Sequence, residues 1–131
     1  MKTRRKGHAL ELLCEICDQC VAEIYRDRFA VYSFHFGKWH TSGFGLEEMQ
    51  AVYKVAQSDR YLKLKCATCN QLPCAVVQLH RLTITTKHKA QNWQTHPNAL
   101  TLEDIEEICR IIGQSDVILS DELDVPGLSA A

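Results

Sequence analysis

The sequence predicts a small α+β protein, a single zinc-stabilised domain with three helices and a short antiparallel sheet. Its 131 residues are enough for one compact domain. Apolar residues make up 46% of the chain and charged residues 24%, a balance that is typical of globular proteins and not of disordered ones. Segments with helical spacing of apolar residues alternate with short β-prone segments, and six of the seven cysteines fall in two tight clusters.

The first half of the chain predicts two helices separated by a strand and a loop. Ala9 to about Arg28 has apolar residues every three or four positions without a glycine or proline, which favours a helix. Phe29 to Phe36 alternates like a strand, with Val31 and His35 on one side. Three glycines predict a loop over residues 37–45, and an apolar face predicts a second helix from Leu46 to Gln57.

The second half predicts two strands, an insert and a third helix. Tyr61–Lys65 is expected to be a short strand, Cys66–Cys74 a turn-rich insert, and Ala75–Thr86 a longer strand rich in β-branched residues. A polar connection over residues 87–99 leads to a helix that begins at Thr101, where an acid three residues later predicts an N-cap, and ends near Gly113. No internal repeat with a period of 20–50 residues is evident.

The charge distribution divides the chain into a basic body and an acidic tail. Residues 1–65 and 66–100 each have a formal charge of +3, whereas residues 101–131 have −7. We therefore expect a basic N-terminal arm at residues 1–8, the zinc-binding domain at 9–113 and a flexible acidic tail at 114–131. Apolar runs are too short for a membrane span and no apolar core follows the basic start, so the protein is expected to be intracellular and in the cytoplasm. The basic start would add the nucleus or nucleolus as a further location.

The clearest local motif is Cys66-Ala67-Thr68-Cys69 followed by Asn70. A short strand that leads into such a turn is typical of a zinc knuckle, in which two thiolates bind one ion at about 2.3 Å. Asn70 favours this interpretation because asparagine readily adopts a positive φ. The motif predicts that Cys66 and Cys69 bind Zn²⁺.

Two completions of this zinc site remain open, because structural zinc takes four ligands. In the first, Cys17 and Cys20 from the upstream cluster supply the other two. In the second, the site is local and uses Cys74 and His80, with His88 as a substitute. His35 and His40 are interpreted as ordinary strand-end histidines, although a second metal site with Cys14 would also use them, and Cys109 is interpreted as a core residue.

Catalysis is not predicted. A redox Cys-x-x-Cys pair needs a lowered thiol pKa, whereas Cys14 and Cys17 lie beside Glu15 and Asp18, which would raise it. No glycine-rich phosphate loop and no acid–base pair is recognisable.

RNA is the predicted partner. The segment from Arg60 to Lys89 contains six Lys or Arg residues and no acid, which indicates contact with a polyanion. The expected phosphate contacts are Lys63, Lys65, Arg81, Lys87 and Lys89, and Trp93 is expected to stack on an unpaired base. The alternative is a zinc-stabilised adaptor that binds no nucleic acid and docks a host or viral protein through its third helix or acidic tail. The basic start, Lys2, Arg4, Arg5 and Lys6, is a nuclear or nucleolar import signal, an arm that clamps phosphates, or only a solubilising segment.

With its basic segment Lys2–Lys6 and its cysteine clusters Cys14–Cys20 and Cys66–Cys74, the chain resembles the small cysteine-rich regulatory proteins of rod-shaped plant RNA viruses, in particular the 14-kilodalton proteins of benyviruses. The resemblance implies suppression of host RNA silencing, zinc-dependent RNA binding and partial nuclear or nucleolar location. Cysteine spacing varies within that family, so the resemblance assigns no individual ligand.

Overall fold

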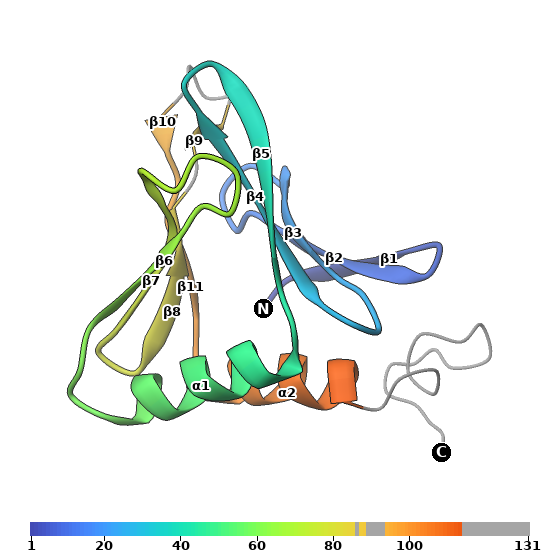
Figure 1. The fold of residues 1–131 in the computed structure, drawn as a ribbon. Coiled ribbons are helices and arrows are strands. Elements are labelled where there is room, and N and C mark those ends of the chain that lie inside the picture. The colour runs from blue at the N-terminus through green and yellow to red at the C-terminus, as the bar shows by residue number, and fades with distance from the viewer. Residues whose placement is uncertain (86, 89–93, 114–131) are drawn as a thin grey trace.

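The structure is a computed structural model that describes residues 1–85, 87–88 and 94–113, with the backbone alone described for residues 87, 88, 94 and 95. Two antiparallel sheets stand side by side above a pair of helices (Figure 1). The predicted combination of three helices and one short sheet is therefore wrong, although the α+β class is broadly similar. No helix in the described ranges is long and apolar enough to cross a membrane.

The first sheet has five strands that follow one another in sequence order. They are β1 (Thr3–Lys6), β2 (Ala9–Leu13), β3 (Cys20–Ile24), β4 (Phe29–His35) and β5 (Lys38–Phe44). The predicted loop at 37–45 is wrong, because β5 occupies it and pairs with all of β4. A tight turn at Phe36 and Gly37, both at positive φ, joins these two strands. Residues 3–6 form an edge strand of this sheet instead of a separate arm.

The helix predicted from Ala9 to Arg28 is also wrong. The segment forms β2 and β3, which pair with a bulge after Leu12 and are joined by the turn that contains Cys14 and Cys17. Leu10, Leu12, Ala22 and Ile24 lie on the inner face, so the same apolar residues that fit a helical spacing also fit two short strands. Pairing of β3 with β4 decides in favour of the strands, and the spacing of apolar residues within the segment does not contain this information.

The second sheet has four strands in the order β11-β8-β7-β6. Its strands are β6 (Leu62–Lys65), β7 (Pro73–Gln78), β8 (Arg81–Ile84) and β11 (Asn98–Leu100), and a separate ribbon pairs β9 (Lys87–His88) with β10 (Gln94–Thr95). The predicted strand Ala75–Thr86 is divided by a tight turn at Leu79 and His80, both at positive φ. The predicted connection at 87–99 contains β9, β10 and the start of β11.

Both remaining helix predictions are confirmed, as α1 (Leu46–Gln57) and α2 (Leu102–Gly113). The predicted N-cap of α2 is present: the Thr101 hydroxyl accepts a hydrogen bond from the Asp104 N–H at 3.1 Å, and the Thr101 N–H donates to the Asp104 carboxylate at 3.0 Å. The two helices pack against each other, with the end of α2 beside Leu46 at the start of α1.

The hydrophobic core lies between the sheets and the helices. Phe29 of the first sheet, Leu82 of the second, Met49 of α1 and Ile105 of α2 are all fully buried in one continuous cluster. The core therefore holds both sheets and both helices together as one folding unit.

The two halves of the chain repeat one order of elements. In each half, a hairpin with a Cys-x-x-Cys turn is followed by further antiparallel strands and a twelve-residue helix. Cys14 and Cys66 are 52 positions apart, so this repeat lies just outside the 20–50 residue range in which the sequence has no evident repeat.

Candidate metal centres

Cys66 and Cys69 lie in the tight turn that the sequence predicts after β6. The Asn70 N–H donates to the Cys66 carbonyl oxygen at 2.8 Å, and the Cys66 N–H donates to the Leu72 carbonyl oxygen at 3.0 Å. Asn70 has a φ of 55°, in the left-handed region that asparagine tolerates. This turn holds the two thiols close together at the end of the second sheet.

The ligands that face these cysteines are two histidines of the first sheet. The ligand atoms of His35, His40, Cys66 and Cys69 all lie within 4.8 Å of one another. His40 Nδ1 lies 3.3 Å from Cys66 Sγ, and His35 Nδ1 lies 3.5 Å from Cys69 Sγ. Two sulfur and two nitrogen donors form a complete ligand set for structural zinc. We call these four residues the complete site.

The electrostatics of the complete site favour a thiolate. Burial raises the pKa of Cys66, but the N–H groups of Cys69 and Thr68 and the imidazoles of His35 and His40 outweigh it and lower the pKa to about 5. Cys66 is therefore ionised at neutral pH, which is the state that binds metal. The chemistry of this donor set fits zinc.

A second cysteine turn has the same backbone shape. The Asp18 N–H donates to the Cys14 carbonyl oxygen at 3.0 Å, and the Cys14 N–H donates to the Gln19 carbonyl oxygen at 2.8 Å. Asp18 has a φ of 66°. The Ile16 N–H donates to Cys14 Sγ at 3.4 Å, a bond that stabilises a thiolate.

Cys14 and Cys17 gather with His96, which immediately follows β10. The ligand atoms of the three residues lie within 4.8 Å of one another, and Cys14 Sγ is 3.6 Å from His96 Nδ1. Burial raises the pKa of Cys14, but hydrogen bonds from Asn98 and from the N–H groups of the turn together lower this pKa by more, so the net shift is downward. We call these three residues the partial site.

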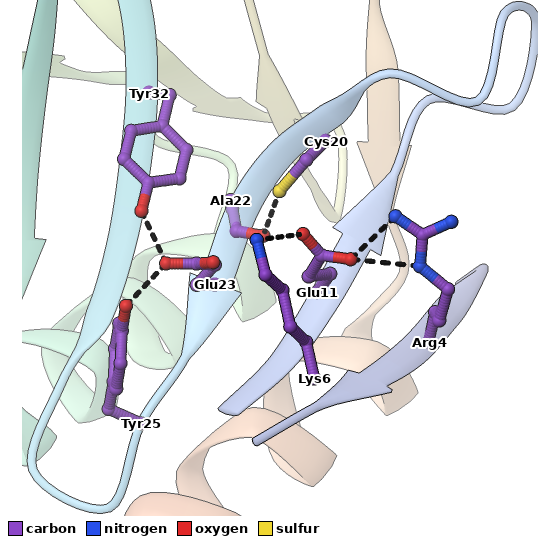
Figure 2. Close-up of polar contacts among 8 residues, drawn as sticks. All are labelled: Arg4, Lys6, Glu11, Cys20, Ala22, Glu23, Tyr25 and Tyr32. Atoms are coloured by element: carbon purple, nitrogen blue, oxygen red, sulfur yellow. Dashed lines mark hydrogen bonds and ion pairs between the residues drawn. The ribbon is translucent and has the colours of Figure 1, made fainter. Parts of the chain in front are cut away.

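A third cluster joins Glu11, Cys20 and Glu23 on the outer face of the first sheet (Figure 2). Unlike the other two, it is already neutralised by neighbouring side chains. Glu11 forms ion pairs with Arg4 and Lys6, and the hydroxyls of Tyr25 and Tyr32 donate to Glu23.

Cys20 in this cluster also has a protein partner, because its thiol donates to the Ala22 carbonyl oxygen at 3.3 Å. Burial and the nearby carboxylates of Glu11 and Glu23 raise the pKa of Cys20 to about 11, so it remains a neutral thiol. Ion pairs and hydrogen bonds thus account for all three groups, and we interpret the cluster as a structural polar network.

The structure forms neither of the two predicted completions. Cys17 belongs to the partial site and Cys20 to the polar network, so neither joins Cys66. The Cys74 thiol instead donates to the Leu64 carbonyl oxygen at 3.3 Å, and His80 Nδ1 lies 2.9 Å from the Ala56 carbonyl oxygen. Cys109 is half-buried against the core, as expected.

Three of the predicted phosphate contacts share the outer face of the second sheet. Lys63 and Lys65 are exposed on β6, and the paired rows of β6, β7 and β8 place Arg81 on the same face. Within the described ranges no carboxylate forms an ion pair with any of the three.

The other predicted contacts are differently placed. Lys87 belongs to β9, where only the backbone is described, whereas Lys89 and Trp93 lie outside the described residues. Lys2 pairs with Asp18, and Arg4 and Lys6 pair with Glu11, so these N-terminal cations are used within the fold. Arg5 lies between them in β1.

Sequence reasoning considered His35 and His40 only beside Cys14 and did not join them to Cys66 and Cys69. His35 and His40 flank the glycine turn between β4 and β5, and that turn was the available signal for a hairpin that brings both imidazoles together. Because residues 37–45 were interpreted as a loop, this hairpin was not predicted.

No family model matches this sequence, and neither a curated protein nor a solved structure matches it. The functional interpretation therefore depends on the clusters and surfaces of the chain itself.

Proposed function

We propose that this is a zinc-dependent protein that contacts RNA through the outer face of its second sheet. The observation that supports zinc is the complete site, in which two cysteines and two histidines from different sheets converge. An ion at this position would cross-link the β4–β5 turn to the β6–β7 turn. Its role would be structural, because all four tetrahedral positions would be filled by protein.

The zinc proposal is tested by elemental analysis of protein purified without chelators. We expect bound zinc, and we expect Cys66→Ser to lose the ion of the complete site. Cys109→Ser is the matched control, since it removes a cysteine from outside every cluster. Zinc-free protein that still melts cooperatively would overturn the proposal.

RNA contact is supported by the basic face formed by Lys63, Lys65 and Arg81. Free cations on a sheet surface attract phosphates without reading the sequence of bases, and counterion release makes such binding sensitive to salt. The structural role of zinc fits this proposal, because the ion would hold the turn that follows Lys65.

A salt titration with single-stranded and double-stranded RNA tests this contact. Affinity should fall steeply as salt rises, and Lys63→Glu/Arg81→Glu should weaken binding and flatten the logarithmic slope by about 1.4 for single strands. Arg26→Glu/Lys54→Glu changes the net charge equally at exposed positions in the β3–β4 turn and in α1, outside the second sheet, and it should keep the wild-type slope. If nuclease-treated protein shows no salt-sensitive RNA binding, the proposal fails and the adaptor alternative takes its place.

Suppression of RNA silencing and nuclear import stay predictions that follow from the resemblance and the basic start. Expression beside a silenced reporter gene in leaves should restore the reporter, and Lys63→Glu/Arg81→Glu should abolish the effect. A fluorescent fusion should enter the nucleus unless Lys2, Arg4, Arg5 and Lys6 are replaced.

A further inference from the structure

We propose that the chain binds a second zinc ion at the partial site, with Cys14, Cys17 and His96 as ligands and His88 as the fourth. This inference does not depend on RNA contact or on zinc at the complete site. It rests on a duplication within the chain that relates the partial site to the complete one.

The strand pairing of the two halves is the same, residue for residue. Rows of paired residues cross four strands in each half, on the face that points to the core. The first half has the rows Leu10–Ile24–Phe29–Phe44 and Leu12–Ala22–Val31–Ser42, and the second has Leu62–Val77–Leu82–Leu100 and Leu64–Ala75–Ile84–Asn98. The halves therefore share register as well as element order.

The contacts around the two cysteine turns repeat as well. The Ala67 N–H donates to Ser42 Oγ at 2.9 Å, and the Glu15 N–H donates to Asn98 Oδ1 at 2.9 Å. Ser42 and Asn98 end equivalent rows, and Ala67 and Glu15 each follow the first cysteine of a turn. Each hydrogen bond joins a turn of one half to a strand of the other half.

The first histidine of each site repeats in the same way. His40 lies two residues before Ser42 and approaches Cys66 to 3.3 Å, and His96 lies two residues before Asn98 and approaches Cys14 to 3.6 Å. The partial site thus reproduces three of the four ligands of the complete site.

The register gives the position of the fourth. In the first half, His35 pairs with Lys38, which lies two residues before His40. In the second half, His88 pairs with Gln94, which lies two residues before His96. His88 therefore occupies the register position of His35, and the sequence has a histidine at both positions.

The chemistry requires no further reactant. Zn²⁺ would bind two thiolates and two imidazoles, and each cysteine that is protonated beforehand would release its proton to solvent. Each ion would take its cysteines from one half and its histidines from the other, so the two ions would cross-link the halves reciprocally.

Native mass spectrometry of the full chain, with elemental analysis, counts the ions. We expect two zinc ions in the wild-type protein, one in Cys14→Ser/Cys17→Ser and one in Cys66→Ser/Cys69→Ser. Cys109→Ser should retain two. If the wild-type protein binds one zinc ion and Cys14→Ser/Cys17→Ser still binds it, the second site is overturned. If the wild-type protein binds one zinc ion that Cys14→Ser/Cys17→Ser loses and Cys66→Ser/Cys69→Ser retains, only the earlier proposal of zinc at the complete site is overturned.

Cobalt titration of the wild-type protein keeps the test sound if a double variant does not fold. Two equivalents should bind, each with the tetrahedral absorption and the charge-transfer intensity of two thiolates. His88→Ala should lower the affinity for one of the two cobalt ions. The decrease should exceed the roughly 10- to 100-fold decrease that loss of an outer hydrogen-bond partner causes. If both ions of His88→Ala bind with wild-type affinity, His88 is not the fourth ligand.

Discussion

At the scale of single residues, Ser42 makes the hydrogen bond that would support the proposed zinc ligand Cys66. Its hydroxyl accepts the N–H that follows Cys66 and is fully buried. We expect Ser42→Ala to lower the zinc affinity of the complete site at least about tenfold without changing the number of bound ions. Competition with a chromophoric chelator measures this effect.

Asn98→Ala is the matched variant, because Asn98 makes the equivalent contact with the turn of Cys14. Asn98→Ala should lower the zinc affinity of the partial site and leave the zinc affinity of the complete site unchanged. If either variant lowers the zinc affinity of both sites equally, this assignment of the two hydrogen bonds is wrong.

Glu11 should make stability depend on acid pH. Two hydrogen bonds from the Arg4 guanidinium hold the pKa of this carboxyl below its usual value, against the effect of burial. A lowered folded-state pKa stabilises the protein above the unfolded value near 4.5, and the contribution disappears as the pH falls through the folded value. Glu11→Gln should therefore cost about 1 kcal/mol at pH 7, and the cost should vanish once the pH has fallen below the lowered folded-state pKa of Glu11.

Urea unfolding of both proteins at each pH measures this difference. Acid release of zinc affects the wild type and the variant alike, so it cancels from the comparison. A stability difference that stays constant from pH 7 to pH 3 would exclude the Glu11 carboxylate as its source.

Sequence reasoning at this scale succeeds where the cause is local. Asn70 indicates the turn of Cys66 because its own backbone preference shapes that turn. The turn of Cys14 has Asp18 at the same position, and without a glycine or proline nearby the spacing of apolar residues favoured a helix instead.

At the scale of elements, the capped start of α2 should contribute measurably to stability. Thr101→Ala removes the hydroxyl that accepts the Asp104 N–H, and we expect a loss of about 1 kcal/mol. Thr101→Gly should cost only a few tenths of a kcal/mol, because water can solvate the exposed N–H groups. Thermal unfolding of both variants measures the effect, and an unchanged Thr101→Ala would mean that packing alone fixes this helix end.

The helices were predictable and several strands were not, for the same physical reason. The periodicity of α1 and the cap of α2 lie within a few neighbouring residues. By contrast, β2, β3 and β5 acquire their identity from partners across the sheet, and their short apolar runs are compatible with a helix or a loop. A glycine such as Gly43, read as a loop signal, is tolerated within β5 beside Arg28.

At the scale of the whole molecule, metal should contribute a large part of the stability. An ion present at about 1,000 times its dissociation constant adds roughly 4 kcal/mol, comparable with the total stability of many small domains. We expect a strong chelator to lower the melting temperature markedly and to broaden the transition in calorimetry. Added zinc should restore both. A transition that chelation does not move would show that the apolar core alone holds the sheets together.

The ligand sets could not be assembled from sequence because their members are far apart in the chain. Cys66 and His40 are separated by 26 positions, and Cys14 and His96 by 82. The predicted completions took the missing ligands from the upstream cysteine cluster or from Cys74 and His80, whereas the structure places histidines of the other sheet beside Cys66 and Cys69.

If both zinc ions bind as proposed, the crossed supply of ligands would make the exposed connection between α1 and β6 dispensable for holding the molecule together. A protease that cleaves beside Arg60 would divide the chain into two fragments of similar size, each with one pair of thiols and the imidazoles for the other. The fragments should co-elute in gel filtration while zinc is present. Once zinc is chelated, a much lower concentration of denaturant should be enough to separate them. The two pieces would then behave as the subunits of a metal-bridged heterodimer.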